Sequence, residues 1–302
     1  VGPATSDLLY QTNLKADYAD SEIDVKTFDV IMDDLKVIAE AKFAEALISV
    51  PTLRVHRGDE TWLNGRLRVP LATEVEGAAD RFWLAEAPLE VEIQSVAIPL
   101  VDLAHLSGSE KLGALKISAF IQGPAAELQG DVRLQGTKIG VETDQSFPST
   151  ADLDLGLLFG GGSMSLKGEI RHTHLQPVSL EANLPFQLKD PQALAEAPLS
   201  GRLKVPPSAL DFLVDVVPSL REIQGKLAAD LQMLGTVKNP EVSGELLLDV
   251  PLVRFDETDL PRLENTKLQI RGTPTQVVIE EAATTFAGGT VTMTGGANFV
   301  RG

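Results

Sequence analysis

The sequence contains no cysteine and few aromatic residues, and each shortage excludes a class of protein. With no Cys among 302 residues, a disulfide scaffold, a thiolate metal site and cysteine catalysis are all ruled out. Aromatic residues make up only 5% of the chain, so its 43% hydrophobic content rests mainly on Leu, Val, Ile and Ala. That hydrophobic content is close to the globular average and is enough for a core.

Positive charge and long apolar runs are scarce as well. The chain has 26 Lys and Arg against 43 Asp and Glu, a net charge of −17, and such a surface repels phosphate backbones. We therefore expect no nucleic acid partner. No stretch reaches the ~18 consecutive apolar residues of a membrane helix, and no signal peptide is present. Any membrane anchor is expected to lie outside this sequence.

Motifs that would indicate an enzyme are also missing. Gly-x-Ser-x-Gly, His-Glu-x-x-His and the Walker lysine are absent, and the run at 160–162 leads into an alternating segment rather than a helix N-terminus. Asp152 and Asp154 have the separation of a polar strand face, which explains them more simply than a glycosidase carboxylate pair does. We predict that the protein is not an enzyme.

A metal site is the remaining candidate for chemistry. His172 and His174 would lie on one face of a strand, a spacing that can bind zinc. Glu169 and Glu181 are the only further ligands that the neighbourhood offers. Two exposed histidines in a loop or at a strand edge explain the pair more simply. We predict no metal and no cofactor.

What the sequence does contain is alternation, most clearly in an eight-residue phrase that occurs twice. Residues 161–168 and 288–295 each begin with two glycines, alternate hydroxyl and apolar residues, and close with a glycine. Period-two alternation places Met164 and Leu166 on one face of a strand and the serines on the other. The repeated phrase predicts a long sheet with one apolar face.

Further local patterns complete the expected secondary structure. Residues 33–46 fit either a helix or a strand, and the surrounding alternation favours strands. Asn64-Gly65 between alternating segments predicts a hairpin turn. The apolar block 98–106 predicts a short helix or cap. A second helix is expected over 209–217, with Ser208 as its N-cap and its apolar face packed on the sheet. Trp62 and Trp83 are expected to serve packing.

The second half of the chain repeats landmarks of the first half in the same order. Gly201 to Pro206 matches Gly65 to Pro70, and the glycine-bounded segment 225–235 matches 113–123. Two further landmarks match at 130–134 with 244–248 and at the double-glycine phrase. These matches predict N-terminal strands over 1–64, a first repeat over 65–197 and a second over 198–302, all in one elongated domain.

One segment of the second repeat resembles a known family. Residues 218–227 lead into Leu234-Gly235-Thr236 and then Asn239-Pro240 and Gly244-Glu245-Leu246, a pattern similar to the TamB group of the AsmA-like proteins. Phe286 to Val291 resembles the glycine-pair strand of the same group. In the first repeat, Gly123-Pro124 replaces Gly235-Thr236 and the Asn-Pro is missing.

The resemblance implies a fold and a role. It implies an all-β fold, with an elongated antiparallel sheet curled into an open trough and one or two short helices. It further implies a bridge-like lipid transport protein of the periplasm, tethered in the inner membrane by a helix outside this sequence. Phospholipids would be its cargo, passing toward the outer membrane, and an outer-membrane barrel of the TamA type its partner. A contribution to outer-membrane protein assembly is also implied.

The alternating apolar sets are the residues we expect to line such a groove, because aliphatic surfaces suit disordered acyl chains. These lining residues are Leu67, Val69, Leu115, Ile117, Ile121, Met164, Leu166, Leu203, Val205, Leu227, Leu231, Met233, Leu246, Leu248, Leu268, Ile270, Val277, Ile279, Val291 and Met293. The alternative is a closed β-solenoid or adhesin-like stalk that fills its core with its own side chains.

Overall fold

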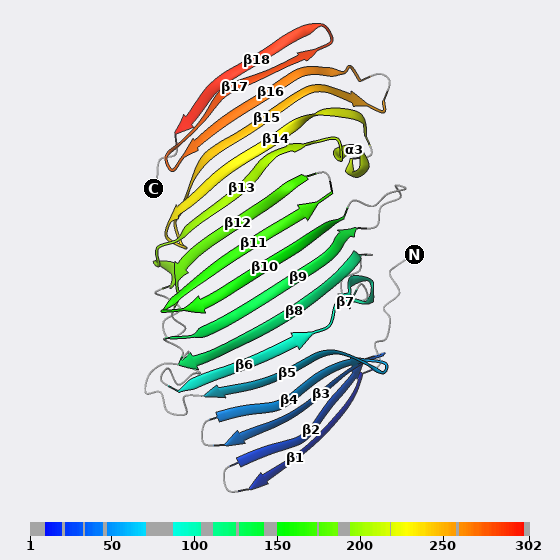
Figure 1. Ribbon diagram of the computed structural model, residues 1–302, viewed down its shortest axis with the longest axis vertical. Coiled ribbons are helices and arrows are strands. Elements are labelled where there is room, and N and C mark those ends of the chain that lie inside the picture. The colour runs from blue at the N-terminus through cyan, green and yellow to red at the C-terminus, as the bar shows by residue number, and fades with distance from the viewer. Residues whose placement is uncertain are drawn as a thin grey trace.

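The fold is a single long sheet in which successive strands lie side by side. The computed structural model describes residues 10–19, 22–32, 34–44, 47–70, 87–103, 111–124, 127–141, 150–173, 175–186, 194–217, 219–257 and 260–298. Within these ranges it has one antiparallel sheet of 18 strands, stacked along the longest axis from β1 at one end to β18 at the other (Figure 1). The expected all-β, open and elongated architecture is confirmed.

The connectivity is a meander, because each strand pairs with the next along the chain. One exception occurs where β6 and the two-residue β7 both pair with β8. The strands are β1 (Tyr10–Ala19), β2 (Glu22–Met32), β3 (Leu35–Ala44), β4 (Leu47–Arg57), β5 (Glu60–Pro70), β6 (Pro88–Ser95), β7 (Ile98–Pro99), β8 (Lys111–Pro124), β9 (Gln129–Val141), β10 (Ala151–Gly160), β11 (Ser163–His172), β12 (Leu175–Pro185), β13 (Ser200–Ala209), β14 (Leu220–Gly235), β15 (Pro240–Phe255), β16 (Leu263–Thr273), β17 (Gln276–Phe286) and β18 (Gly289–Asn298).

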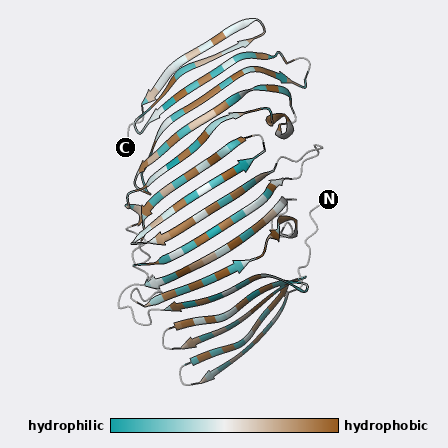
Figure 2. Ribbon diagram, viewed as in Figure 1, coloured by the Kyte–Doolittle hydropathy of each residue, from teal (hydrophilic) through white to brown (hydrophobic). Residues whose placement is uncertain are grey.

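Sequence alternation accounts for most of these strands. Figure 2 shows hydrophobic and hydrophilic residues alternating along them, as expected for a sheet with two unlike faces. The ambiguous segment 33–46 is strand β3, so the strand interpretation is confirmed. Gly161 and Gly162 form the turn between β10 and β11, with φ of 58° and 70°, values that favour glycine.

The hairpin predicted at Asn64-Gly65 is wrong. Both residues lie in the middle of β5, where Gly65 stands opposite Leu53 on one side and Ile93 on the other. A Cβ at Gly65 would lie 3.2 Å from the Glu92 carbonyl oxygen, so glycine permits a close strand approach there rather than a turn. The actual turn before β5 contains Gly58, whose φ is 54°.

Trp62 is buried in the sheet, in agreement with the packing role expected for it, while Trp83 lies outside the described residues. The Trp62 side chain is 3% exposed. The Arg57 guanidinium lies over its ring, 5.2 Å from the centroid, close enough for a cation–π contact.

Short helical segments interrupt the meander in the described part of the chain, and two of them lie before strands of the sheet. These two are the 3-10 turn η1 (Leu100–Leu103) and the helix α3 (Leu213–Val216). Because η1 precedes β8 and α3 precedes β14, which run in the same direction, both lie at the same rim of the sheet, hereafter the helix rim (Figure 1). Among the described helices, none is long and apolar enough to span a membrane.

The N-cap predicted at Ser208 is wrong. Ser208 belongs to β13 and is only 1% exposed, because its hydroxyl is used inside the sheet. Its Oγ donates to the Pro206 carbonyl and accepts a hydrogen bond from the Gln176 backbone N–H. The helix begins later, after Phe212, and no side chain caps it.

Irregular glycines recur at matching places in the two halves of the sheet. Gly123 and Gly235 end strands β8 and β14 with φ of 110° and 92°. Gly130 and Gly244, early in β9 and β15, have φ of 136° and 138°. Glycines with positive φ therefore occur in the same order in both halves, which agrees with an internal repeat. The boundaries of the repeats stay a prediction.

Candidate functional site

One face of the sheet is apolar from end to end, and hereafter we call it the apolar face. Residues directly opposite in adjacent antiparallel strands point to the same face. The register can therefore be followed from Leu67 to Val91 and Ile121, and later from Leu231 to Gly244 and Gly272. Away from the strand ends, no charged side chain shares this face among the described residues.

All twenty residues that the sequence predicted to line a groove lie on the apolar face. Leu166 stands opposite Leu157 on one side and Ala182 on the other, and Leu203 stands opposite Leu180 and Leu231. The structure thus places these side chains on a common surface.

This face is only partly covered by protein. Leu14, Phe28, Ile170 and Val242, which lie on this face in β1, β2, β11 and β15, are between 36% and 61% exposed. On β18, at the C-terminal end of the sheet, Val291 and Met293 are 60% and 54% exposed. Eight apolar residues are buried among those described: Trp62, Leu100, Leu128, Ala182, Leu210, Ile223, Val250 and Val253.

Among the described residues, a cluster of buried apolar side chains lies on the apolar face at the helix rim. Leu210 packs with Ile223 of β14 and with Val250 and Val253 of β15. Three partly buried residues of the segment around α3 pack against these side chains: Phe212, Leu213 and Val214. The expectation that this segment packs its apolar face on the sheet is confirmed. Hereafter this is the α3 cluster.

Two predicted lining residues contact the α3 cluster. Leu227 of β14 and Leu248 of β15 are partly buried against it. They therefore mark the place where the free part of the apolar face ends on these two strands. His172, which the sequence offered as a metal ligand, lies close to this cluster, with its ring centroid 5.1 Å from that of Phe212.

A hollow opens on the apolar face on the other side of this boundary. It has a volume of about 400 Å³ and lies over β14 to β17. Gly244 and Gly272 stand opposite each other across β15 and β16, so neither strand supplies a side chain at that point. The lining residues are Leu231, Pro240, Val242, Ser243, Gly244, Leu246, Ile270, Gly272, Thr273, Pro274 and Val277.

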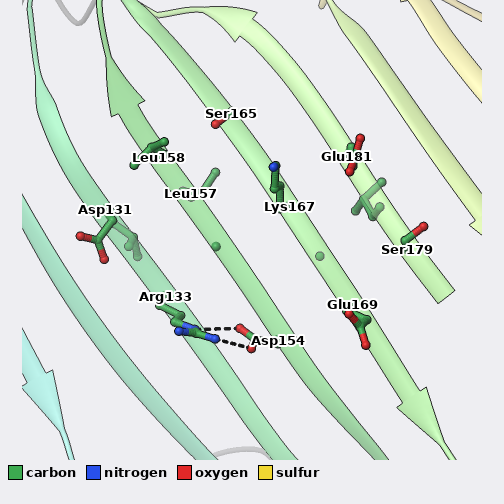
Figure 3. A pocket seen from close by; sticks show the side chains of 14 residues that line it. Asp131, Arg133, Asp154, Leu157, Leu158, Ser165, Lys167, Glu169, Ser179 and Glu181 are labelled. Carbon is green, nitrogen blue, oxygen red and sulfur yellow. Dashed lines mark hydrogen bonds and ion pairs between the residues drawn. The ribbon is translucent and has the colours of Figure 1, made fainter. Parts of the chain in front are cut away.

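The opposite face is polar and held together by ion pairs between neighbouring strands. Arg133 of β9 makes two hydrogen bonds to Asp154 of β10, with Nε–Oδ1 and Nη2–Oδ2 distances of 2.9 and 2.6 Å (Figure 3). Arg202 and Asp230 form the same bidentate pair between β13 and β14. In both pairs, the hydrogen bond from the guanidinium lowers the pKa of the carboxyl group.

A depression lies on this polar face, at Gly156. Its volume is about 510 Å³, and Arg133, Asp154, Lys167 and Glu181 surround it (Figure 3). Because Gly156 has no side chain, a gap remains between Arg133 and Lys167, which stand opposite it on either side. The depression is explained by this missing side chain.

The residues considered for chemistry have structural partners. Asp154 is bound by Arg133, and Asp152 accepts a hydrogen bond from the Lys138 backbone N–H at 2.8 Å. His174 lies outside the described residues. In the part of the chain that is described, no group of three or more His, Asp or Glu side chains could hold a metal ion.

Sequence reasoning missed the two glycines of the hollow and the apolar residues of β10 and β12. Leu155, Leu157, Leu180 and Leu184 share the apolar face with the predicted set. The alternation Leu153-Asp154-Leu155 carries this signal in the sequence. The pairing of Gly244 with Gly272 has no local signal, because it depends on the register between two strands.

The sheet can now be compared with known proteins. Neither curated proteins nor solved structures give a match. A family model does match residues 113–248, which run from β8 into β15, and its description is TamB, N-terminal domain. That family acts in the cell envelope, in lipid transport and outer-membrane assembly with outer-membrane partners. With its open antiparallel sheet and this match across the strands at its centre, the chain is similar to the TamB family over residues 113–248.

Proposed function

We propose that this chain is a section of a non-enzymatic conduit that shields phospholipid acyl chains on its apolar face. The conduit would cross the periplasm, tethered in the inner membrane and directed toward an outer-membrane barrel of the TamA type. The observation that carries this proposal is the apolar face itself, which is uncharged between the strand ends and left partly exposed along the described sheet.

The chemistry of this face suits hydrocarbon. Acyl chains need apolar area and no hydrogen-bonding partners, and burying each methylene contributes about 0.8 kcal/mol. An acyl chain of roughly sixteen carbons could thus gain on the order of 10 kcal/mol before ordering costs. Headgroups would remain outside the sheet, because a charged group on this face would be left without a partner.

The stalk interpretation fits the structure less well. A closed solenoid needs a core filled by its own side chains, whereas the described sheet is open. Among the described residues, the protein's own side chains fill only small regions of the apolar face, such as the α3 cluster. An exposed apolar surface of this extent is costly in water unless something covers it.

The test compares charge on the two faces of the same strands. Met164→Asp, Leu231→Asp and Met293→Asp introduce a carboxylate on the apolar face. Ser165→Asp, Gln232→Asp and Thr292→Asp place it one residue away, on the polar face. Each purified variant would be examined by native mass spectrometry and by lipid analysis after organic extraction.

We expect copurifying phospholipid to fall in the first set and to match the unmodified chain in the second. Full lipid load in the first set would overturn the proposal. An unmodified chain without phospholipid would point to the stalk instead.

A further inference from the structure

The apolar face over β14 to β17 is divided into two unlike halves. Toward the helix rim, the α3 cluster fills the space with the protein's own side chains. Toward the opposite rim, the hollow at Gly244 and Gly272 leaves the face open. Leu227 and Leu248 stand at the boundary, since both contact the α3 cluster.

The depth of the hollow is fixed by the backbone. Gly244 has a φ of 138°, and a Cβ built there would lie 2.1 Å from the Asp230 carbonyl oxygen. No other residue fits this position without moving β14. Gly272 is different, because its Cβ would meet only the Gly244 carbonyl oxygen, at 4.0 Å. The gap at Gly272 is therefore free space that a side chain could fill.

The lining of the hollow specifies what could occupy it. The walls near the glycines are aliphatic, from Leu231, Leu246, Ile270 and Val277. At the open rim, Pro240 and Pro274 have no backbone N–H to offer. A peptide segment or a second copy of the chain would bring backbone N–H and C=O groups that these walls cannot satisfy. Hydrocarbon needs no such partners.

We propose that this hollow is a discrete seat for one acyl chain, which enters from the rim opposite α3 and stops at Leu227 and Leu248. The inference rests on the proposed function and adds a defined position and an end stop. The hollow, of about 400 Å³ and open on one side, has room for part of one acyl chain.

The test fills the seat without disturbing the backbone. Gly272→Leu places four carbon atoms in the hollow, and Gly272→Ala places one. Gly156→Leu is the matched control, since its Cβ would also meet only a carbonyl oxygen, that of Lys167 at 3.9 Å, but on the polar face. Circular dichroism and thermal unfolding would show that the variants remain folded.

The probe is a phospholipid with a photoreactive diazirine near the end of one acyl chain, presented in vesicles of phosphatidylethanolamine and phosphatidylglycerol. After irradiation, mass spectrometry would locate adducts along the chain. We expect adducts on Leu231, Leu246 or Ile270 in the unmodified protein. Gly272→Leu should reduce them at least about tenfold, Gly272→Ala less, and Gly156→Leu not at all.

The outcomes separate this inference from the proposed function. Adducts on the apolar face of β9 to β12, with none over β14 to β17, would refute the seat and leave the conduit standing. Unchanged adducts over β14 to β17 in Gly272→Leu would refute the seat as well. No adduct anywhere on the apolar face would overturn both.

Discussion

At the scale of single residues, two positions at equivalent places in the sheet accept only glycine. Gly130 in β9 and Gly244 in β15 have nearly the same φ, 136° and 138°. A Cβ at either position would lie 1.9 or 2.1 Å from a backbone oxygen of the preceding strand. A residue other than glycine would therefore combine backbone strain with a clash that no side-chain rotation relieves.

Gly244→Ala is expected to destabilise the sheet by at least about 2 kcal/mol, because the added methyl group must displace β14. Gly272→Ala, its cross-strand neighbour, should change the free energy of unfolding by less than about 0.5 kcal/mol. Chemical denaturation followed by circular dichroism measures both. Gly130→Ala should resemble Gly244→Ala if the two halves repeat one design. Equal stability of the three variants would show that these backbone positions are not special.

At the scale of elements, the short helix α3 is held by its contacts. A helix of four residues without a side-chain cap cannot persist alone, so the α3 cluster must hold it in place. We expect Leu210→Ala to cost about 2–4 kcal/mol, because Leu210 is 5% exposed and its loss leaves a cavity. Leu158→Ala, at a site 60% exposed on the polar face, is the control and should be nearly neutral. Thermal unfolding compares the two, and equal losses would contradict the importance of the cluster.

The sequence predicts the elements of this fold better than their ends. Alternation reveals strands because one side of the sheet is apolar, and it places residues as distant as Leu67 and Met293 on one face. The turn at Asn64-Gly65 fails because the same dipeptide also permits a close strand approach in β5. The prediction of Ser208 as a helix cap fails because its hydroxyl accepts a hydrogen bond from the backbone of Gln176, which is distant in the sequence. The hollow could not be predicted, since it depends on strand register.

At the scale of the whole molecule, stability must vary along the sheet. In the described part of the chain, each strand contacts mainly its neighbours, so no central core there links the two ends of the sheet. In the first strand, Leu14 and Tyr18 are 61% and 74% exposed, and all ten residues of β18 are exposed. The α3 cluster, by contrast, is anchored on β14 and β15. Opening is therefore expected to begin at the ends and to reach these two strands last.

Hydrogen exchange measures this gradient directly. Paired backbone amides in β14 and β15 should exchange at least about 100-fold more slowly than those in β1 and β18, because only the former require loss of the α3 cluster. Leu210→Ala should reduce this difference in exchange rate, because exchange becomes faster in β14 and β15 and stays unchanged in β1. Uniform protection over the sheet would mean that it opens as one cooperative unit. A conduit that must admit lipid along its length is served better by the graded behaviour, since its ends can adjust while the strands around the seat hold their register.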